Sequence, residues 1–230
     1  MQGFLRPLSF FFGVPALFLL SRDIGYFRKA AIGAGILGIL LFSFDFVAEF
    51  NNAWGWGIDF IIPYIFWDTV SADIMVWYFL WVFLIILFYE HFLEHDRSRR
   101  ISRHAVPVAI AGVGIAAVIV ATYLYAPHLL VVPYAYAVLS FLISLVCVVE
   151  LYRRPHLGRK VVKLIPFFAL FFMAYEIIAL YTGLWTFPGT YVGSVAVGNL
   201  MFPLEELVVW ILMSSAMAAL YYEFTIGDER

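Results

Sequence analysis

The sequence predicts an all-α integral membrane protein with about seven transmembrane helices, arranged as two parallel three-helix repeats joined by a connector helix. Three observations support this class: the composition, the spacing of uncharged stretches, and an internal repeat. Of the 230 residues, 64% are hydrophobic and only 13% are charged, and the mean hydropathy is +0.94. A soluble domain is about half apolar and about a quarter charged. This chain therefore has more apolar surface than one water-exposed fold can bury.

The same composition excludes several other classes of protein. A net charge of −2 with 20% aromatic residues does not fit a disordered chain or a nucleic-acid binder. The single cysteine, Cys147, permits no internal disulfide and no zinc cage. No lysine falls inside a predicted span, which excludes a retinal Schiff base, and there is no phosphate-binding or dinucleotide motif. We therefore expect no cofactor and no metal site. His91 and His95, at i and i+4, are interpreted as solvated residues at a helix end.

Uncharged stretches of about 20 residues place the spans, because that length of helix crosses the hydrocarbon layer. The predicted spans are 4–20, 30–50, 71–93, 105–125, 129–149, 164–183 and 204–223. The segment Leu8 to Leu20 could also be the core of a signal peptide, but no small-residue cleavage site follows it. The repeat described below needs this segment as a span.

Basic residues follow alternate spans and so predict the orientation. Loops 51–70, 126–128 and 184–203 contain no lysine or arginine, whereas three other loops hold 12 of the 14. These are Arg22, Arg28, Lys29, Arg97, Arg99, Arg100, Arg103, Arg153, Arg154, Arg159, Lys160 and Lys163. The positive-inside rule then predicts a multi-pass protein of the cell membrane, with the N-terminus outside and the C-terminus cytoplasmic.

Residues of the second and sixth predicted spans recur at a constant interval. An offset of 131 relates five pairs: Asp45/Glu176, Ala48/Ala179, Asn52/Gly183, Trp54/Trp185 and Trp56/Phe187. In the following spans the offset is 133, relating Asp73-Ile74-Met75-Val76-Trp77 to Glu206-Leu207-Val208-Val209-Trp210, and Tyr89-Glu90 to Tyr222-Glu223. Such self-similarity predicts two copies of a three-helix unit. Residues 1–93 form the first repeat, 94–128 a basic loop with the connector helix, and 129–230 the second repeat. The connector gives both copies the same orientation, unlike an inverted transporter repeat.

Carboxyl groups in the spans mark the predicted site, because ionisable residues inside a membrane are costly. They gather near the predicted outer ends of four helices: Asp45, Glu49, Asp73, Glu176, Glu205 and Glu206. The only cation expected on that side is Arg6. Desolvation and crowding then leave a mixture of neutral and ionised carboxyls, which can supply a general acid and a general base.

Adjacent residues on a helix point about 100° apart, so at most one of Glu205 and Glu206 faces the shared site. We expect this to be Glu206, the counterpart of Asp73. Glu205 follows Pro203 and can alternatively be a helix N-terminal residue favoured by the dipole. Aromatic residues cluster at the same depth, either as an interfacial belt or as walls that stabilise a carbocation by cation–π attraction. The expected wall is Trp54, Trp56, Trp77, Trp185, Phe187, Tyr191 and Trp210.

Taken together, these motifs resemble the small integral-membrane lycopene cyclases, whose repeat carries D-x-x-A, G-x-W-x-[YF], P-x-E-E and a later Tyr-Glu pair. The second half carries Glu176, Ala179, Gly183, Trp185, Phe187, Tyr191, Gly193, Pro203, Glu205, Glu206, Tyr222 and Glu223. The first half keeps Asp45, Ala48, Trp54, Trp56, Tyr89 and Glu90. It departs from the pattern at two places: Val70-Ser71-Ala72-Asp73 replaces P-x-E-E, and Asn52 replaces the glycine.

The resemblance implies an isomerase of carotenoid biosynthesis that cyclises the end groups of lycopene without net redox chemistry. An acid protonates the terminal double bond, the chain closes on the cation, and a carboxylate removes a ring proton. The expected catalytic residues are Glu206, Asp45, Glu176, Asp73 and Glu205. The expected partners are a carotenoid substrate and the lipid bilayer, and possible further partners are a second copy of the chain or other carotenoid-pathway enzymes.

Three alternatives remain open at the level of sequence. A carotenoid hydratase shares the protonation step, but water then captures the cation. A proton-coupled transporter also contains intramembrane acids, although these are expected at the midplane near broken helices. A carotenoid-binding subunit without activity of its own is the third.

Overall fold

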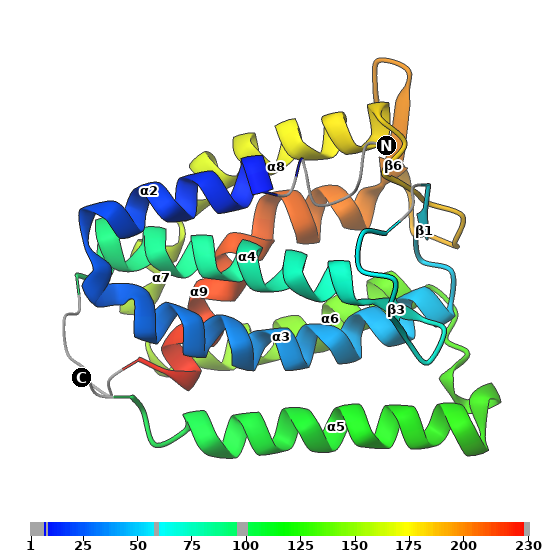
Figure 1. Ribbon diagram of the computed structural model, residues 1–230, viewed down its shortest axis with the longest axis horizontal. Helices are drawn as coiled ribbons and strands as arrows, with labels where there is room; N and C mark the ends of the chain where they lie inside the picture. The colour runs from blue at the N-terminus through cyan, green and yellow to red at the C-terminus, as the bar shows by residue number, and fades with distance from the viewer. Residues whose placement is uncertain (1–6, 8, 58–59, 96–100, 228–230) are drawn as a thin grey trace.

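The protein is a bundle of apolar helices capped at one end by short strands (Figure 1). The computed structural model describes residues 7, 9–57, 60–95 and 101–227. Within these residues, six helical segments are long and apolar enough to cross a membrane: Ile24–Phe50, Ala72–Glu94, Ala105–Tyr125, Ala135–Arg153, Leu164–Tyr181 and Glu206–Thr225. The prediction of a multi-pass helical membrane protein is confirmed.

The spans begin and end close to the predicted limits, and several contain short turns of other helix types. The helices are α2 (Val14–Arg22), α3 (Phe27–Phe50), α4 (Ala72–Tyr89), α5 (Ala105–Tyr125), α6 (Ala135–Arg153), α7 (His156–Val161), α8 (Leu164–Tyr181) and α9 (Ser214–Thr225). Wider π-helical turns form η1 (Ser9–Gly13), η3 (Glu90–Glu94) and η5 (Glu206–Met213). Single 3₁₀ turns form η2 (Ile24–Tyr26) and η4 (Pro127–Leu130).

The first predicted span, 4–20, corresponds to η1 and α2, which together run from Ser9 to Arg22. These 14 residues rise about 21 Å, less than the roughly 30 Å of a hydrocarbon layer. Residues 4–6 and 8 of that prediction lie outside the described residues. The segment packs against α4, and Phe12 contacts Tyr175 of α8 with ring centroids 5.0 Å apart. The count of seven spans stays a prediction.

One boundary corrects the sequence analysis. Helix α3 begins at Phe27, three residues before the predicted span, because no helix breaker separates Phe27 from Ala30. Lys29 therefore lies within the first turn of this helix and is buried, rather than preceding the span. It is at the opposite end of α3 from the carboxyl cluster described below.

Helices α3 and α8 end in the same way. The amide of Ala53 donates to the carbonyl of Ala48 (2.9 Å), and the amide of Leu184 donates to that of Ala179 (2.8 Å). The residue before each of these donors has a left-handed backbone, with φ of 55° at Asn52 and 68° at Gly183. Glycine and asparagine adopt this conformation more readily than other residues. The replacement of glycine by Asn52 therefore preserves the turn.

Three two-stranded sheets lie at one end of the bundle, here called the strand end (Figure 1). Strand β1 (Gly55–Trp56) pairs antiparallel with β4 (Trp185–Thr186), and Gly55 lies opposite Thr186. Strands β2 (Ile65–Phe66) and β3 (Val70–Ser71) form one hairpin, and β5 (Ser194–Val197) and β6 (Leu200–Pro203) form another. The β1–β4 pair joins the two halves of the chain across the bundle. A Cβ atom at Gly57 would lie 2.1 Å from the carbonyl oxygen of Gly183, so this junction requires glycine.

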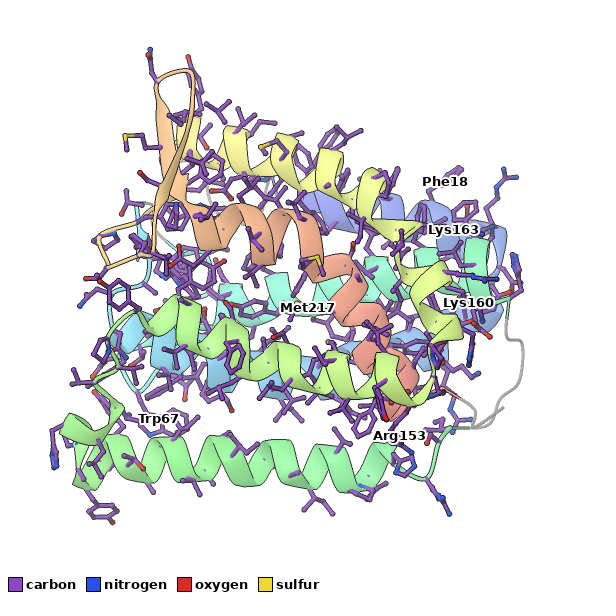
Figure 2. All side chains as sticks on the ribbon, turned by 180° about the vertical axis from the view of Figure 1, so that it is seen from behind. Phe18, Trp67, Arg153, Lys160, Lys163 and Met217 are labelled. Atoms are coloured by element: carbon purple, nitrogen blue, oxygen red, sulfur yellow. The ribbon has the colours of Figure 1, made fainter. Side chains whose placement is uncertain are left out.

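Charged residues gather at the opposite end, where Figure 2 labels Arg153, Lys160 and Lys163. Ion pairs link Arg154 to Glu150 and to Glu223, and Lys160 to Glu94. Helices α4 and α9 are also joined there by two reciprocal bonds. The hydroxyl of Tyr89 donates to Glu223 (2.7 Å), and the hydroxyl of Tyr222 donates to Glu90. The halves are thus tied at both ends of the bundle.

Helix α5 lies along the edge of the bundle against α3 (Figure 1). Many of its apolar side chains are exposed, including Val106, Ile110, Val113 and Val118. Exposed apolar residues over a whole helix are what a lipid environment requires. This helix corresponds to the predicted span 105–125.

Candidate functional site

An apolar cavity of about 110 Å³ lies inside the bundle near the strand end. Side chains of α3, α4, α6, η5 and α9 surround it, together with residues of β1 and β4. Its aromatic lining residues are Phe44, Trp54, Trp56, Trp77, Tyr78, Trp81, Tyr136, Trp185, Phe187, Trp210 and Tyr221. An apolar cavity of roughly 150 Å³ is known to hold a benzene ring. This cavity, about three-quarters of that volume, is on the scale of a small hydrocarbon group.

Glu206 is the only carboxyl group among the described residues that line this cavity. It is buried at the first position of η5, and its Oε2 accepts a hydrogen bond from the hydroxyl of Tyr136 at 2.7 Å. The π-helical turns of η5 are uncommon in proteins and often occur at functional sites. Glu206 is thus a carboxyl group positioned to contact a hydrophobic ligand.

Glu176 forms a pair with Glu206. It is fully buried on α8, and its Oε1 accepts a hydrogen bond from the indole N–H of Trp185 at 3.0 Å. The carboxyl groups of Glu176 and Glu206 lie within hydrogen-bonding reach of each other. A hydrogen bond between two carboxyls requires a proton on one of them, and the two groups then titrate as one system. The pair can therefore store a proton beside the cavity.

Asp45 forms a second carboxyl pair, with Glu49 on the next turn of α3. The hydroxyl of Tyr78 donates to Asp45 at 2.8 Å, and the indole of Trp56 donates to Glu49 at 2.7 Å. Tyr78 lines the cavity, but Asp45 does not. Asp45 is therefore connected to the cavity through its hydrogen bond with Tyr78.

Asp73 does not line the cavity. Its two carboxylate oxygens accept from the backbone amides of Ile61 (2.7 Å) and Ile62 (2.9 Å), which fixes the loop between β1 and β2. Glu205 contacts the corresponding loop of the second half, because its Oε1 accepts from the amide of Val192 at 2.7 Å. Ile61 and Val192 differ by the repeat offset of 131. Asp73 thus corresponds in role to Glu205, one residue away from the partner assigned by the sequence. Glu206 has no counterpart in the first half.

Replacing Asp73 by alanine is expected to destabilise the fold, because the partly buried amides of Ile61 and Ile62 lose their acceptor. A hydrogen bond to a charged group contributes about 1.5–3 kcal/mol, so unfolding should become easier by about 2–5 kcal/mol. Thermal unfolding of the detergent-solubilised protein measures this change. Asp68→Asn is the control, since Asp68 is an exposed acid in the neighbouring turn between β2 and β3. An unchanged unfolding midpoint for Asp73→Ala would contradict the role of Asp73 in fixing the loop between β1 and β2.

Most of the predicted aromatic wall surrounds the cavity. Trp54, Trp56, Trp77, Trp185, Phe187 and Trp210 all line it. The rings of Trp77 and Trp210, which the sequence pairs by offset, lie 5.0 Å apart. Tyr191 does not line the cavity. Its hydroxyl donates to the carbonyl of Ala53 at 2.6 Å, and burial raises the pKa of Tyr191 to about 12, which keeps the donor protonated.

Five further aromatic cavity residues were not singled out from the sequence: Phe44, Tyr78, Trp81, Tyr136 and Tyr221. Tyr78 and Tyr136 donate to site carboxyls, and the indole of Trp81 lies 4.8 Å from that of Trp210. A tyrosine deep in an apolar span needs a hydrogen-bond partner for its hydroxyl. That requirement was the one signal in the sequence for Tyr78 and Tyr136.

The ion pairs among the described residues lie at the opposite end, away from these carboxyls. Arg6, the one cation predicted near the acids, is outside the described part of the chain. No cluster of three potential metal ligands occurs within the described ranges. Glu94, between His91 and His95, instead contacts Lys160 and Tyr89.

No protein-family model, no curated protein and no solved structure matches this chain. The function proposed below therefore rests on the residues and contacts described above.

Proposed function

We propose that this protein is a carotenoid end-group cyclase that acts in the membrane by proton-initiated, non-redox cyclisation of a lycopene-type substrate. The observation that carries the proposal is Glu206: one protonatable carboxyl facing an aromatic, otherwise apolar cavity. Such a group can protonate a hydrocarbon double bond only where water is excluded and the resulting cation is stabilised. Both conditions fit the surroundings of Glu206.

In the proposed reaction Glu206 transfers its proton to the terminal carbon–carbon double bond of the polyene. The electron pair of a second double bond then closes the ring onto the resulting cation. The indoles of Trp77 and Trp210 face this region and stabilise positive charge through their π faces. Proton loss from the carbon next to the cation forms the new double bond, and the Glu206 carboxylate takes this proton. The cycle consumes no oxidant or reductant, and Glu206 returns to its starting state.

The other carboxyls support this cycle. Glu176 shares a proton with Glu206 and so holds the carboxylate that remains after proton transfer. Asp45 accepts from the Tyr78 hydroxyl, which makes the Tyr78 oxygen more electron-rich where it borders the cavity. Both effects favour the charge-separated intermediate over the neutral polyene.

We further propose that the chain consists of two three-helix units related by a pseudo-two-fold axis, with α5 as the connector. Antiparallel pairing of Gly55 with its counterpart Thr186 supports this, because a two-fold axis places equivalent residues opposite each other. The reciprocal Tyr89–Glu223 and Tyr222–Glu90 bonds have the same isologous form. The basic residues at one end of the bundle support a cytoplasmic location for that end. The strand end and the cavity then lie toward the outer face of the cell membrane.

Expression in a lycopene-accumulating bacterium tests the activity directly. We expect cyclised carotenoid of unchanged molecular mass, separated by chromatography and identified by mass spectrometry. A product heavier by one water would instead identify a hydratase. Unchanged lycopene, with the protein shown to be inserted in the membrane, would contradict the proposal. Pigment that co-purifies without conversion would contradict it as well.

A further inference from the structure

A second cavity, of about 490 Å³, lies between α6 and the η5–α9 helix, next to the first cavity. Its volume is within the roughly 300–1,000 Å³ of ordinary ligand pockets. The two cavities share the side chains of Val209 and Met217, and Figure 2 shows Met217 between these helices. The second cavity is a groove rather than a closed chamber, because Phe141, Val148 and Met213 on its walls are exposed.

The groove is elongated and has a polar end and an apolar end. Along α6 its lining runs from Ala137 to Leu151, which is about 21 Å of helix. At the strand end it contains Glu205 and Ser140, whereas Val161 of α7 borders its other end. Most of the remaining lining side chains are apolar. This distribution fits a single-chain amphiphile with its head group at the strand end.

Two buried polar atoms at that end have no hydrogen-bond partner among the described residues: Oε2 of Glu205 and Oγ of Ser140. Their residues are 7% and 5% exposed. Asp73, which fixes the matching loop in the first half, has both oxygens bonded, whereas Glu205 uses only Oε1 for this purpose. A buried acceptor without a donor costs about 1–3 kcal/mol. The loop contact therefore does not account for the second oxygen of Glu205.

We propose that this groove binds a lipid alcohol, with its hydroxyl donating to Oε2 of Glu205 and its hydrocarbon chain lying along α6 toward α7. Ser140 lies at the same end and offers a donor for the oxygen of that hydroxyl. A neutral hydroxyl satisfies a buried acceptor without the desolvation cost of an amine cation. A plain hydrocarbon would leave both polar atoms unsatisfied. The inference concerns Glu205 and does not depend on chemistry at Glu206.

Photolabelling of the full-length protein in phosphatidylcholine nanodiscs tests this binding without any carotenoid. The probe is hexadecanol that carries a photoreactive diazirine in its chain. We expect labelled peptides, identified by mass spectrometry, around Ser144 on α6 and Met213 on the facing helix. Excess hexadecanol should compete about tenfold better than hexadecyl methyl ether or hexadecane, the ratio expected for one hydrogen bond.

Two pairs of variants make the test specific. Glu205→Gln retains an acceptor for Val192 but turns an amide N–H₂ toward the groove, so the preference for alcohol over ether should disappear. Glu206→Gln should label like the original protein. Ser144→Trp fills the groove and should prevent labelling, whereas Val138→Trp, at an exposed position of α6 outside the groove lining, should not.

Equal competition by the ether or by hexadecane in the original protein would overturn the proposal. So would stronger competition by hexadecylamine, or labelling outside the groove. If the original protein shows alcohol selectivity but no cyclisation of lycopene, the proposed function is overturned and this site remains intact.

Discussion

Glu206→Gln is expected to abolish carotenoid cyclisation. The amide has nearly the same shape as the acid and can still accept a hydrogen bond from Tyr136, but it has no proton to give to a double bond. General acid catalysis contributes typically 10²- to 10⁴-fold, and no other described carboxyl lines the cavity. Conversion should therefore fall by at least about 10²-fold. Product formation per folded molecule, measured in membranes supplied with lycopene, checks this.

Glu223→Gln is the matched control for this experiment. Glu223 is also a buried acid with a tyrosine donor, but it lies at the opposite end of the same helical span. Its conversion per folded molecule should stay close to that of the original protein. If Glu206→Gln keeps its activity, Glu206 is not the acid. If Glu223→Gln loses activity equally, the effect is not specific to the cavity.

Tyr89→Phe and Tyr222→Phe are each expected to destabilise the protein by about 1–3 kcal/mol, because each removes a donor to a buried carboxyl. The rings of Tyr89 and Tyr222 lie 6.2 Å apart, so the loss in the double variant is expected to differ from the sum of the two single losses. Unfolding by heat or by increasing SDS measures this loss. Tyr152→Phe is the control, since Tyr152 is 88% exposed.

Neither tyrosine lines the cavity, so cyclisation per folded molecule should remain unchanged in both variants. An unfolding midpoint equal to that of the Tyr152→Phe control would show that the reciprocal bonds do not join the halves. A normal midpoint with lost activity would instead assign these residues to the reaction.

The helices could be predicted from the sequence because each span is a long apolar stretch, and lipid exposure leaves little room for another interpretation. The site was only partly predictable. The 100° rotation between neighbouring helical residues correctly separates Glu206 from Glu205, since the two residues line different cavities.

The constant offset between the two repeats assigned Asp73 a counterpart whose contacts differ from its own. The offset of 133 pairs it with Glu206, but its hydrogen bonds match those of Glu205. A shift of one residue between two acids leaves the pattern of the sequence almost unchanged, and only the loop amides reveal it. The contacts of Tyr78 and Tyr136 depend on which helices become neighbours, which an apolar pattern does not specify.

The ties at both ends of the bundle limit how a long polyene can reach Glu206. Strand pairing joins the halves at one end, and the tyrosine–glutamate bonds join them at the other. The two halves therefore cannot separate by a hinge motion at either end of the bundle. For the proposed reaction we therefore expect the polyene to enter from the bilayer with one end first. Forming rings at both tips would then require the molecule to leave, turn around and return, so singly cyclised product should accumulate before the doubly cyclised one.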